Sequence, residues 1–266
     1  ERWITYGAGP ARSMVYGSYP LDVANRSITR ALVMVHGAGR NANHYFETST
    51  AAAFLAGALD NTIVIAPHFI AGRDTPQANE VVWPNRGDTW RSGGMSPSNP
   101  TLSSFDLTDE ILRKLADKKT FPNLTRIVVA GHSAGGQFAT RYEMANKVDG
   151  TLGGVTISYV VANPSSYAWP AAVRPEPVGN ADPATAVTEA LGESAEKVNA
   201  QFTYGPFDST RAPNYDRWPA GLEHRTGYTA QMTDDQLKKQ LAERQTTYLL
   251  GQVDVLPLGG FDSSPS

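Results

Sequence analysis

A serine between glycines follows a run of branched apolar residues near the middle of this chain. Residues 127–130 are typical of a buried strand, and residues 137–145 have the pattern of a helix. Gly131 and Gly135 stand two positions before and two positions after Ser133, which leaves room for a very sharp strand-to-helix turn. The pattern predicts a nucleophilic Ser133 at the tip of that turn, although a glycine-rich turn with an idle serine would have the same local sequence.

A second glycine turn, His36-Gly37-Ala38-Gly39, follows residues 28–35. The apolar run predicts a strand buried on both faces of a parallel sheet. A loop without side-chain bulk lets backbone N–H groups point at an oxygen that becomes negatively charged. We expect the amides of Ala38 and Ala134 to form an oxyanion hole, with Gly39 as a further candidate donor.

Composition narrows the classes of partner. The 266 residues include 23 Lys and Arg and 26 Asp and Glu without a basic run, which argues against nucleic acid and favours a small, neutral substrate. No cysteine is present, and histidines and carboxylates do not cluster at ligand spacings, so we expect neither metal nor cofactor. No apolar run approaches the roughly 18–20 residues that span a bilayer, and the richest, residues 51–59, predicts a buried helix. The sequence does not indicate an oligomeric state.

The other segments alternate between helix and strand patterns, which is typical of an α/β domain. Residues 1–27 predict an edge hairpin or meander. Further strands are expected at 62–67, 155–162 and 246–251, and helices at 43–59, 103–118 and 236–244. The first of these helices should bury Phe46, Ala53, Phe54 and Ala58. The long polar loop 71–102 is expected to form a wall of the pocket.

Residues from about 163 to 232 are rich in proline and large aromatic side chains. Linkers rarely contain so many aromatic residues, so we predict a cap over the active site, inside a single domain of residues 1–266. An ordinary surface excursion is the alternative. The arginines of this segment, Arg174, Arg211 and Arg217, together with its aromatic residues, suggest a substrate with a ring or a carboxylate.

With these motifs placed, the chain resembles the α/β-hydrolase superfamily over nearly its whole length, and secreted or periplasmic esterase-like members in particular. The resemblance implies a mostly parallel central sheet with helices on both faces and a cap insertion. It also implies that Ser133 is the nucleophile and that Ala38 and Ala134 bind the oxyanion. Asp254 stands just after the expected strand 246–251, where the acid that orients a catalytic histidine would lie, and Asp262 is the alternative.

The family's catalytic histidine follows the acid, on a loop after one more strand, whereas this chain has no histidine after His224. We therefore expect the last strand and the catalytic-histidine loop to lie beyond Ser266, in a part that was cleaved or left out. A base from elsewhere and a degenerate hydrolase are the alternatives. His224, in the expected cap, is the weaker candidate for the base, and His36 and His132 are expected to be structural because each lies in a glycine turn.

These observations predict a serine hydrolase that cleaves a carboxylic ester through an acyl-enzyme on Ser133. An amidase, a peptidase or an acyltransferase would use the same apparatus, and a catalytically inactive binding protein is the alternative that the missing histidine favours. A first residue other than methionine, Glu1, and the sequons that begin at Asn25 and Asn123 lead us to expect a secreted or periplasmic protein.

Overall fold

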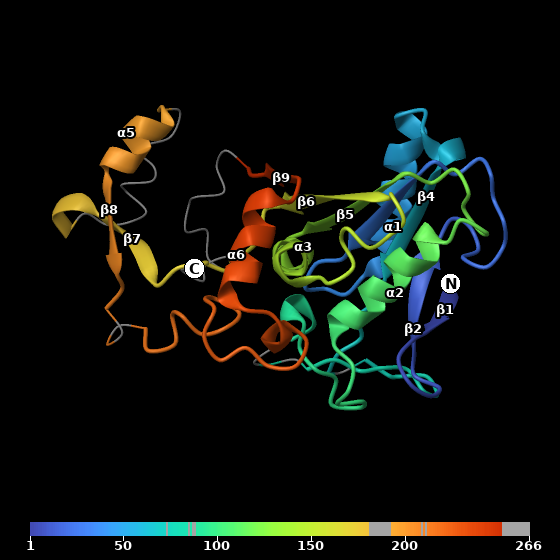
Figure 1. Ribbon diagram of the computed structural model, residues 1–266, viewed down its shortest axis with the longest axis horizontal. Helices are drawn as coiled ribbons and strands as arrows, with labels where there is room; N and C mark the ends of the chain where they lie inside the picture. The colour runs from blue at the N-terminus through green and yellow to red at the C-terminus, as the bar shows by residue number, and fades with distance from the viewer. Residues whose placement is uncertain are drawn as a thin grey trace.

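Seven strands form the central sheet. The computed structural model describes residues 1–72, 74–84, 86, 89–180, 193–208, 210 and 212–251 (Figure 1). In sheet order the strands are β1 (Arg2–Thr5), β2 (Arg12–Gly17), β4 (Thr62–Pro67), β3 (Arg30–Val35), β5 (Arg126–His132), β6 (Thr156–Ala162) and β9 (Thr246–Leu249). β1 and β2 form an antiparallel hairpin, and β2 pairs antiparallel with β4. All other pairs are parallel, which confirms the mostly parallel sheet.

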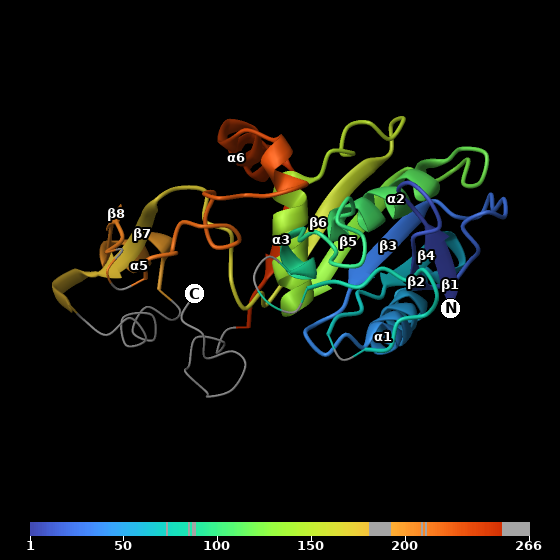
Figure 2. The same cartoon turned by 90° about the horizontal axis from the view of Figure 1, so that it is seen from below.

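Helices cover the two faces of the sheet unequally. Figure 2 shows α1 (Ala42–Leu55) against one face, whereas α2 (Ser104–Ala116), α3 (Ala134–Ala145) and α6 (Asp234–Glu243) lie over the other. The expected helices on both faces are therefore confirmed. Within the described ranges, none of the helices combines the length and the apolar character that crossing a membrane requires.

The uneven cover corrects the prediction for residues 28–35, because β3 is not buried on both faces. Val33 and Val35 are fully buried on the face that α3 covers. Leu32 and Met34 point to the opposite face and are only half-buried. In the described part of the chain α1 is the helix on that face, and it lies against β2, β3 and β4, so the apolar residues further along the sheet keep contact with solvent.

The prediction for the first helix is wrong at its end. α1 stops at Leu55, and Phe54 and Leu55 are 69% and 84% exposed, so residues 51–59 are not a buried helix. The buried stripe runs instead through Ala42 and Ser49. Phe54 is one residue from the half-buried Ala53, and one residue turns a helix by about 100°, which carries Phe54 away from the sheet.

Helix α2 confirms the helix expected at 103–118, begins with a capping box at Ser103, and adds a buried junction. Ser103 accepts a hydrogen bond from the Phe105 amide at 3.1 Å, and Asp106 accepts one from the Ser103 amide at 2.7 Å. Asp109, which is buried, accepts hydrogen bonds from the hydroxyl groups of Tyr142 at 2.7 Å and Tyr228 at 2.8 Å. This carboxylate therefore joins α2 to α3 and to the segment that precedes α6.

Part of segment 163–232 projects from the sheet as a separate hairpin. β7 (Val173–Pro177) pairs antiparallel with β8 (Phe202–Pro206), and α5 (Ala195–Ala200) lies beside them, far from β1 (Figure 1). The returning part of the segment packs on the main body, where the indole of Trp218 donates a hydrogen bond to the Ser92 carbonyl at 2.9 Å. The role of this segment as a cap over the active site stays a prediction.

Candidate active site

Ser133 stands at the junction between β5 and α3. Its backbone has φ 56° and ψ −120°, a left-handed conformation that side chains disfavour. The Ser133 amide donates a hydrogen bond to the Ala162 carbonyl at 3.0 Å, and the Ser133 carbonyl accepts one from the Gln137 amide at 3.0 Å. The strand β6 on one side and the first turn of α3 on the other thus hold a half-buried serine at a helix N-terminus.

The glycines around Ser133 are required because backbone packs directly on backbone. A Cβ added to Gly131 would overlap the carbonyl group of Gly135, and a Cβ on Gly135 would overlap the Val35 carbonyl. A Cβ on Gly136 would lie 2.7 Å from the Ala162 carbonyl oxygen. These contacts explain why both glycines that flank the predicted nucleophile, and the one that follows them, lack side chains.

The second glycine turn is fixed from inside by His36. This histidine is fully buried, and its Nε2 accepts a hydrogen bond from the Phe69 amide at 3.0 Å. We therefore assign the ring hydrogen to Nδ1, which donates to the Gly37 carbonyl at 2.9 Å. Burial lowers the pKa of His36 to about 3, so the ring stays neutral. The expected structural role of His36 is confirmed.

Arg40 holds the same turn from outside. Its Nε and Nη2 bind the two carboxylate oxygens of Asp74 at 2.6 and 3.1 Å, and its Nη1 donates to the Ala38 carbonyl at 3.4 Å. The hydrogen bonds from Arg40 hold the pKa of Asp74 below its usual value. Ala38 and Gly39 themselves are exposed. The turn is rigid at both ends, and its middle residues face solvent.

Tyr45 connects the two turns, which the sequence analysis missed. Its hydroxyl lies 3.3 Å from Nδ1 of His132, the residue before the serine. A Cβ on Gly37 would come within 2.8 Å of the same hydroxyl oxygen. Burial raises the pKa of Tyr45, which keeps the hydroxyl protonated. Its place in the first turn of the helix that follows His36-Gly37-Ala38-Gly39 is the sequence signal that could have identified it.

The triad is not assembled among the described residues. All five histidines lie in the described ranges, and none of them hydrogen-bonds to Ser133 there. His224, the weaker candidate base, is 62% exposed in its side chain and lies 3.9 Å from Glu223. Asp254 and the alternative Asp262 lie outside the described residues. The acid, the base and the two oxyanion donors therefore stay predictions.

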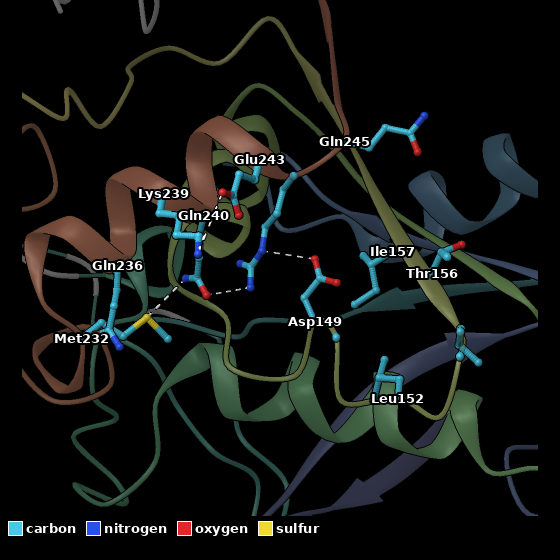
Figure 3. A pocket seen from close by; sticks show the side chains of 14 residues that line it. Asp149, Leu152, Thr156, Ile157, Met232, Gln236, Lys239, Gln240, Glu243 and Gln245 are labelled. Atoms are coloured by element: carbon cyan, nitrogen blue, oxygen red, sulfur yellow. Dashed lines mark hydrogen bonds and ion pairs between the residues drawn. The ribbon is translucent and has the colours of Figure 1, made fainter.

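Two cavities are relevant to this site. One of about 230 Å³ lies along the first turns of α3, and its walls include Arg91, Gln137 and Ser166. A larger one of about 760 Å³ lies where β6 begins, under α6, and Figure 3 shows its lining. Ser133 does not line the larger cavity. In the described ranges, no three His, Asp or Glu side chains group closely enough to hold a metal ion.

Comparisons with known proteins agree with this architecture. A similar solved structure is poly(aspartic acid) hydrolase-1 from Sphingomonas sp. KT-1, at 21% identity and a TM-score of 0.55, over 95% of this chain and 71% of that one. Another is LpqC, a poly(3-hydroxybutyrate) depolymerase from Bordetella parapertussis, at 15% identity and a TM-score of 0.45, over 91% and 79%. A search of curated proteins found no match. The sequence model of the alpha/beta hydrolase family matches residues 32–260. This chain belongs to the alpha/beta hydrolase family.

Proposed function

We propose that this protein is a serine hydrolase that cleaves a carboxylic ester through an acyl-enzyme on Ser133. The observation that supports the proposal most is the backbone of Ser133, at φ 56° and ψ −120° between β5 and α3. Such a conformation costs about 1–3 kcal/mol and is typical of functional positions. The turn lifts a half-buried hydroxyl to the carboxyl end of the parallel strands, where hydrolases of this family place their nucleophile.

In the proposed reaction, the Ser133 oxygen attacks the ester carbonyl carbon while its proton passes to a general base. The negative oxygen of the tetrahedral intermediate accepts hydrogen bonds from the amides of Ala38 and Ala134. Ala134 is the first residue of α3, so the positive end of the helix dipole also favours this charge. The alcohol leaves with a proton from the base, and water then cleaves the acyl-enzyme by the same route.

The proposal needs a base, which the described residues do not bring to Ser133. As the family resemblance implies, we assign this role to a histidine that Asp254 orients. An intact mass of the protein from its source, compared with the mass of these 266 residues, tests whether further residues supply that histidine.

The experiment treats the protein from its source with a fluorophosphonate, which bonds to activated serines, and measures the intact mass. We expect one adduct, lost in Ser133→Ala and kept in Ser194→Ala, an exposed serine just before α5. A mass well above 28.6 kDa plus one adduct would support a base from additional residues. A mass near 28.6 kDa without adduct would contradict the proposal and favour an inactive binding protein.

A second measurement separates the leaving groups. Ester hydrolysis predicts that p-nitrophenyl butyrate is cleaved much faster than the p-nitroanilide of the same acid. Comparable kcat/KM values for the two would favour an amidase or peptidase, and ester formation from an added alcohol would favour an acyltransferase.

A further inference from the structure

The small cavity lies along α3, the helix that begins directly after Ser133, although Ser133 itself does not line it. Gln137 lines this cavity and stands four residues after Ser133 on the same helix, which is about 6 Å along its axis. The other walls come from the loop after β4, which contributes Arg86 and Arg91, and from the loop after β6, which contributes Ser166. Since the carboxyl ends of parallel strands meet at one edge of a sheet, the cavity and the serine share that edge.

Arg91 lines this cavity with an unused hydrogen-bonding group. Its Nε is buried and has no hydrogen-bond partner. Its Nη1 makes one long hydrogen bond, 3.5 Å, to the side-chain carbonyl of Gln137. In the described part of the chain no carboxylate forms an ion pair with Arg91, and the charge that acts on it is the like charge of Arg40. A guanidinium taken from water without an anion is costly, and a bound anion would offset that cost.

Arg2 also has a buried Nε without a hydrogen-bond partner, whereas three other mostly buried arginines of the described residues are paired with carboxylates. Arg40 is paired with Asp74, and Arg174, one of the arginines of the segment 163–232, lies 3.6 Å from Asp216. In the larger cavity, Arg244 lies 3.2 Å from Asp149 and donates to Gln240 at 2.9 Å, as the dashed lines of Figure 3 show. In the larger cavity, the charge of Arg244 is therefore already paired. In the small cavity, the charge of Arg91 is not paired with a carboxylate among the described residues.

Hydrogen bonds tie the other walls of the small cavity to one another. Arg141 lines the same cavity, and its Nη2 donates to the Ser166 hydroxyl at 3.0 Å while its Nε donates to the Pro219 carbonyl at 3.0 Å. The Gln137 amide nitrogen donates to Ser166 as well, at 2.9 Å. These bonds fix the walls in place, so a ligand would meet a rigid, positively charged recess.

We propose that Arg91 binds a carboxylate carried by the acyl part of the substrate, so that the preferred substrate is a half-ester of a dicarboxylic acid or an acidic polyester. The inference rests on the proposed function, because it takes Ser133 as the point of attack. One helical turn, about 6 Å along the axis of α3, separates Ser133 from Gln137, and an extended acyl chain of about six carbons is long enough to span that turn. This anionic substrate replaces the neutral one that the overall charge of the chain suggested.

The test compares two six-carbon esters, p-nitrophenyl hexanoate and mono-p-nitrophenyl adipate, which differ by the terminal carboxylate. We expect kcat/KM to be about 10- to 100-fold higher for the adipate, mainly through KM, since hydrogen bonds to charged groups are strong. Arg91→Met should abolish the preference, and Arg91→Lys should retain part of it. Arg126→Met removes the same charge at the opposite end of β5 and should leave the preference unchanged.

Calorimetric titration of adipate into Ser133→Ala requires no turnover and separates the two proposals. Adipate binding that is lost when Arg91→Met is added supports the carboxylate site, even if neither ester is hydrolysed and the proposed function alone fails. Hydrolysis of both esters at equal kcat/KM, unchanged by Arg91→Met, overturns the carboxylate site and leaves the esterase standing. If neither ester is hydrolysed and adipate does not bind, both proposals are overturned.

Discussion

Two glycines in two strands of this protein have opposite surroundings. Gly131, in β5, lies so close to α3 that a methyl group there would overlap a backbone carbonyl. Gly205, in β8 of the projecting hairpin, has no atom within 4 Å of the position that its Cβ would take. At the centre of the sheet, therefore, contact between backbones decides which residue is allowed. In the hairpin, space allows a much wider choice of residues.

The same contrast extends to burial. All twelve residues of α3 are buried, whereas the apolar residues Val173 and Tyr204 of the hairpin are 37% and 54% exposed. The geometry of the proposed nucleophile thus belongs to the part of the molecule that tolerates least change. Arg91, which we propose to bind the substrate, lies in the short 3-10 helix η2 (Trp90–Ser92), which packs against α3.

The largest expected effect comes from adding one methyl group in each region. Gly131→Ala should lower the free energy of unfolding by about 3 kcal/mol or more, because backbone must move to admit the Cβ. Gly205→Ala should leave it unchanged or raise it by about 0.5 kcal/mol, since alanine restricts the unfolded chain. Urea denaturation followed by tryptophan fluorescence measures both. A similar decrease in the free energy of unfolding for both variants would contradict the difference in packing between the centre and the hairpin.

A buried carboxylate within the centre should make stability depend on pH, an effect that the described strands of the hairpin lack. Glu143, in α3, accepts a hydrogen bond from Thr246 of β9, but its Oε2 is buried without a partner. Burial raises the pKa of Glu143 from 4.5 to about 7, so the folded state holds this proton more tightly than the unfolded state. The contribution is fully present below pH 4.5 and is lost as the pH rises through about 7.

Glu143→Gln keeps an acceptor for Thr246 and removes the titration. We expect this variant to be more stable than the native protein at pH 8, by up to about 3 kcal/mol, and to show no gain at pH 4. Urea denaturation at both pH values checks the difference, with Glu243→Gln on the exposed side of α6 as the control. A gain of equal size at both pH values would contradict the assignment to ionisation of Glu143.

The backbone of Ser133 predicts a smaller effect that belongs to the centre alone. Ser133→Gly should be more stable than Ser133→Ala by about 1 kcal/mol, because glycine accepts φ 56° without strain but loses more freedom on folding. Both variants lack the proposed nucleophile, so the comparison isolates the backbone. Thermal unfolding of the pair measures it, and equal stability would mean that the strain at Ser133 is no larger than the entropy that glycine loses on folding.

Sequence reasoning predicted the centre of the molecule well for the same steric reason. The spacing of Gly131, Ser133 and Gly135 leaves few backbone arrangements, so the strand, the sharp turn and the helix followed from local sequence. The errors at Phe54 and in β3 have a common cause, since both lie on the face where α1 is the covering helix in the described chain. The spacing of apolar residues is the same whether or not another helix packs on them, so it does not predict which apolar faces are buried.

Side-chain partners far apart in sequence were beyond that reasoning. Tyr45 contacts His132 across 87 positions, and Arg91 meets Gln137 across 46. Neither pair has a spacing that marks it, because the sheet order brings the loops together. Arg174, one of the arginines that composition singled out, pairs with Asp216 within its own segment, and Arg211 lies outside the described residues. Which charge is free is therefore a property of the fold rather than of the count of arginines.

The smallest expected effect comes from the ion pair that supports the proposed oxyanion turn. Arg40 and Asp74 are 26% and 30% exposed, so the pair should contribute only about 0.5–1 kcal/mol, which Asp74→Asn removes at pH 7. Because Arg40 lowers the pKa of Asp74, this contribution is present above the unfolded pKa and lost as the pH falls through the folded one. The difference between native protein and Asp74→Asn should therefore vanish in acid, with exposed Asp60→Asn as the control.

The same variant distinguishes support of the turn from support of the fold. If Arg40 positions the Ala38 amide through the bond to its carbonyl, Asp74→Asn should slow fluorophosphonate labelling of Ser133 several-fold while the free energy of unfolding changes little. Labelling at the native rate would mean that His36 and Tyr45 hold the turn without help from the ion pair. Slower labelling would show that the half-buried pair of Arg40 and Asp74 also positions the turn, in addition to the hydrogen bonds of His36 and Tyr45.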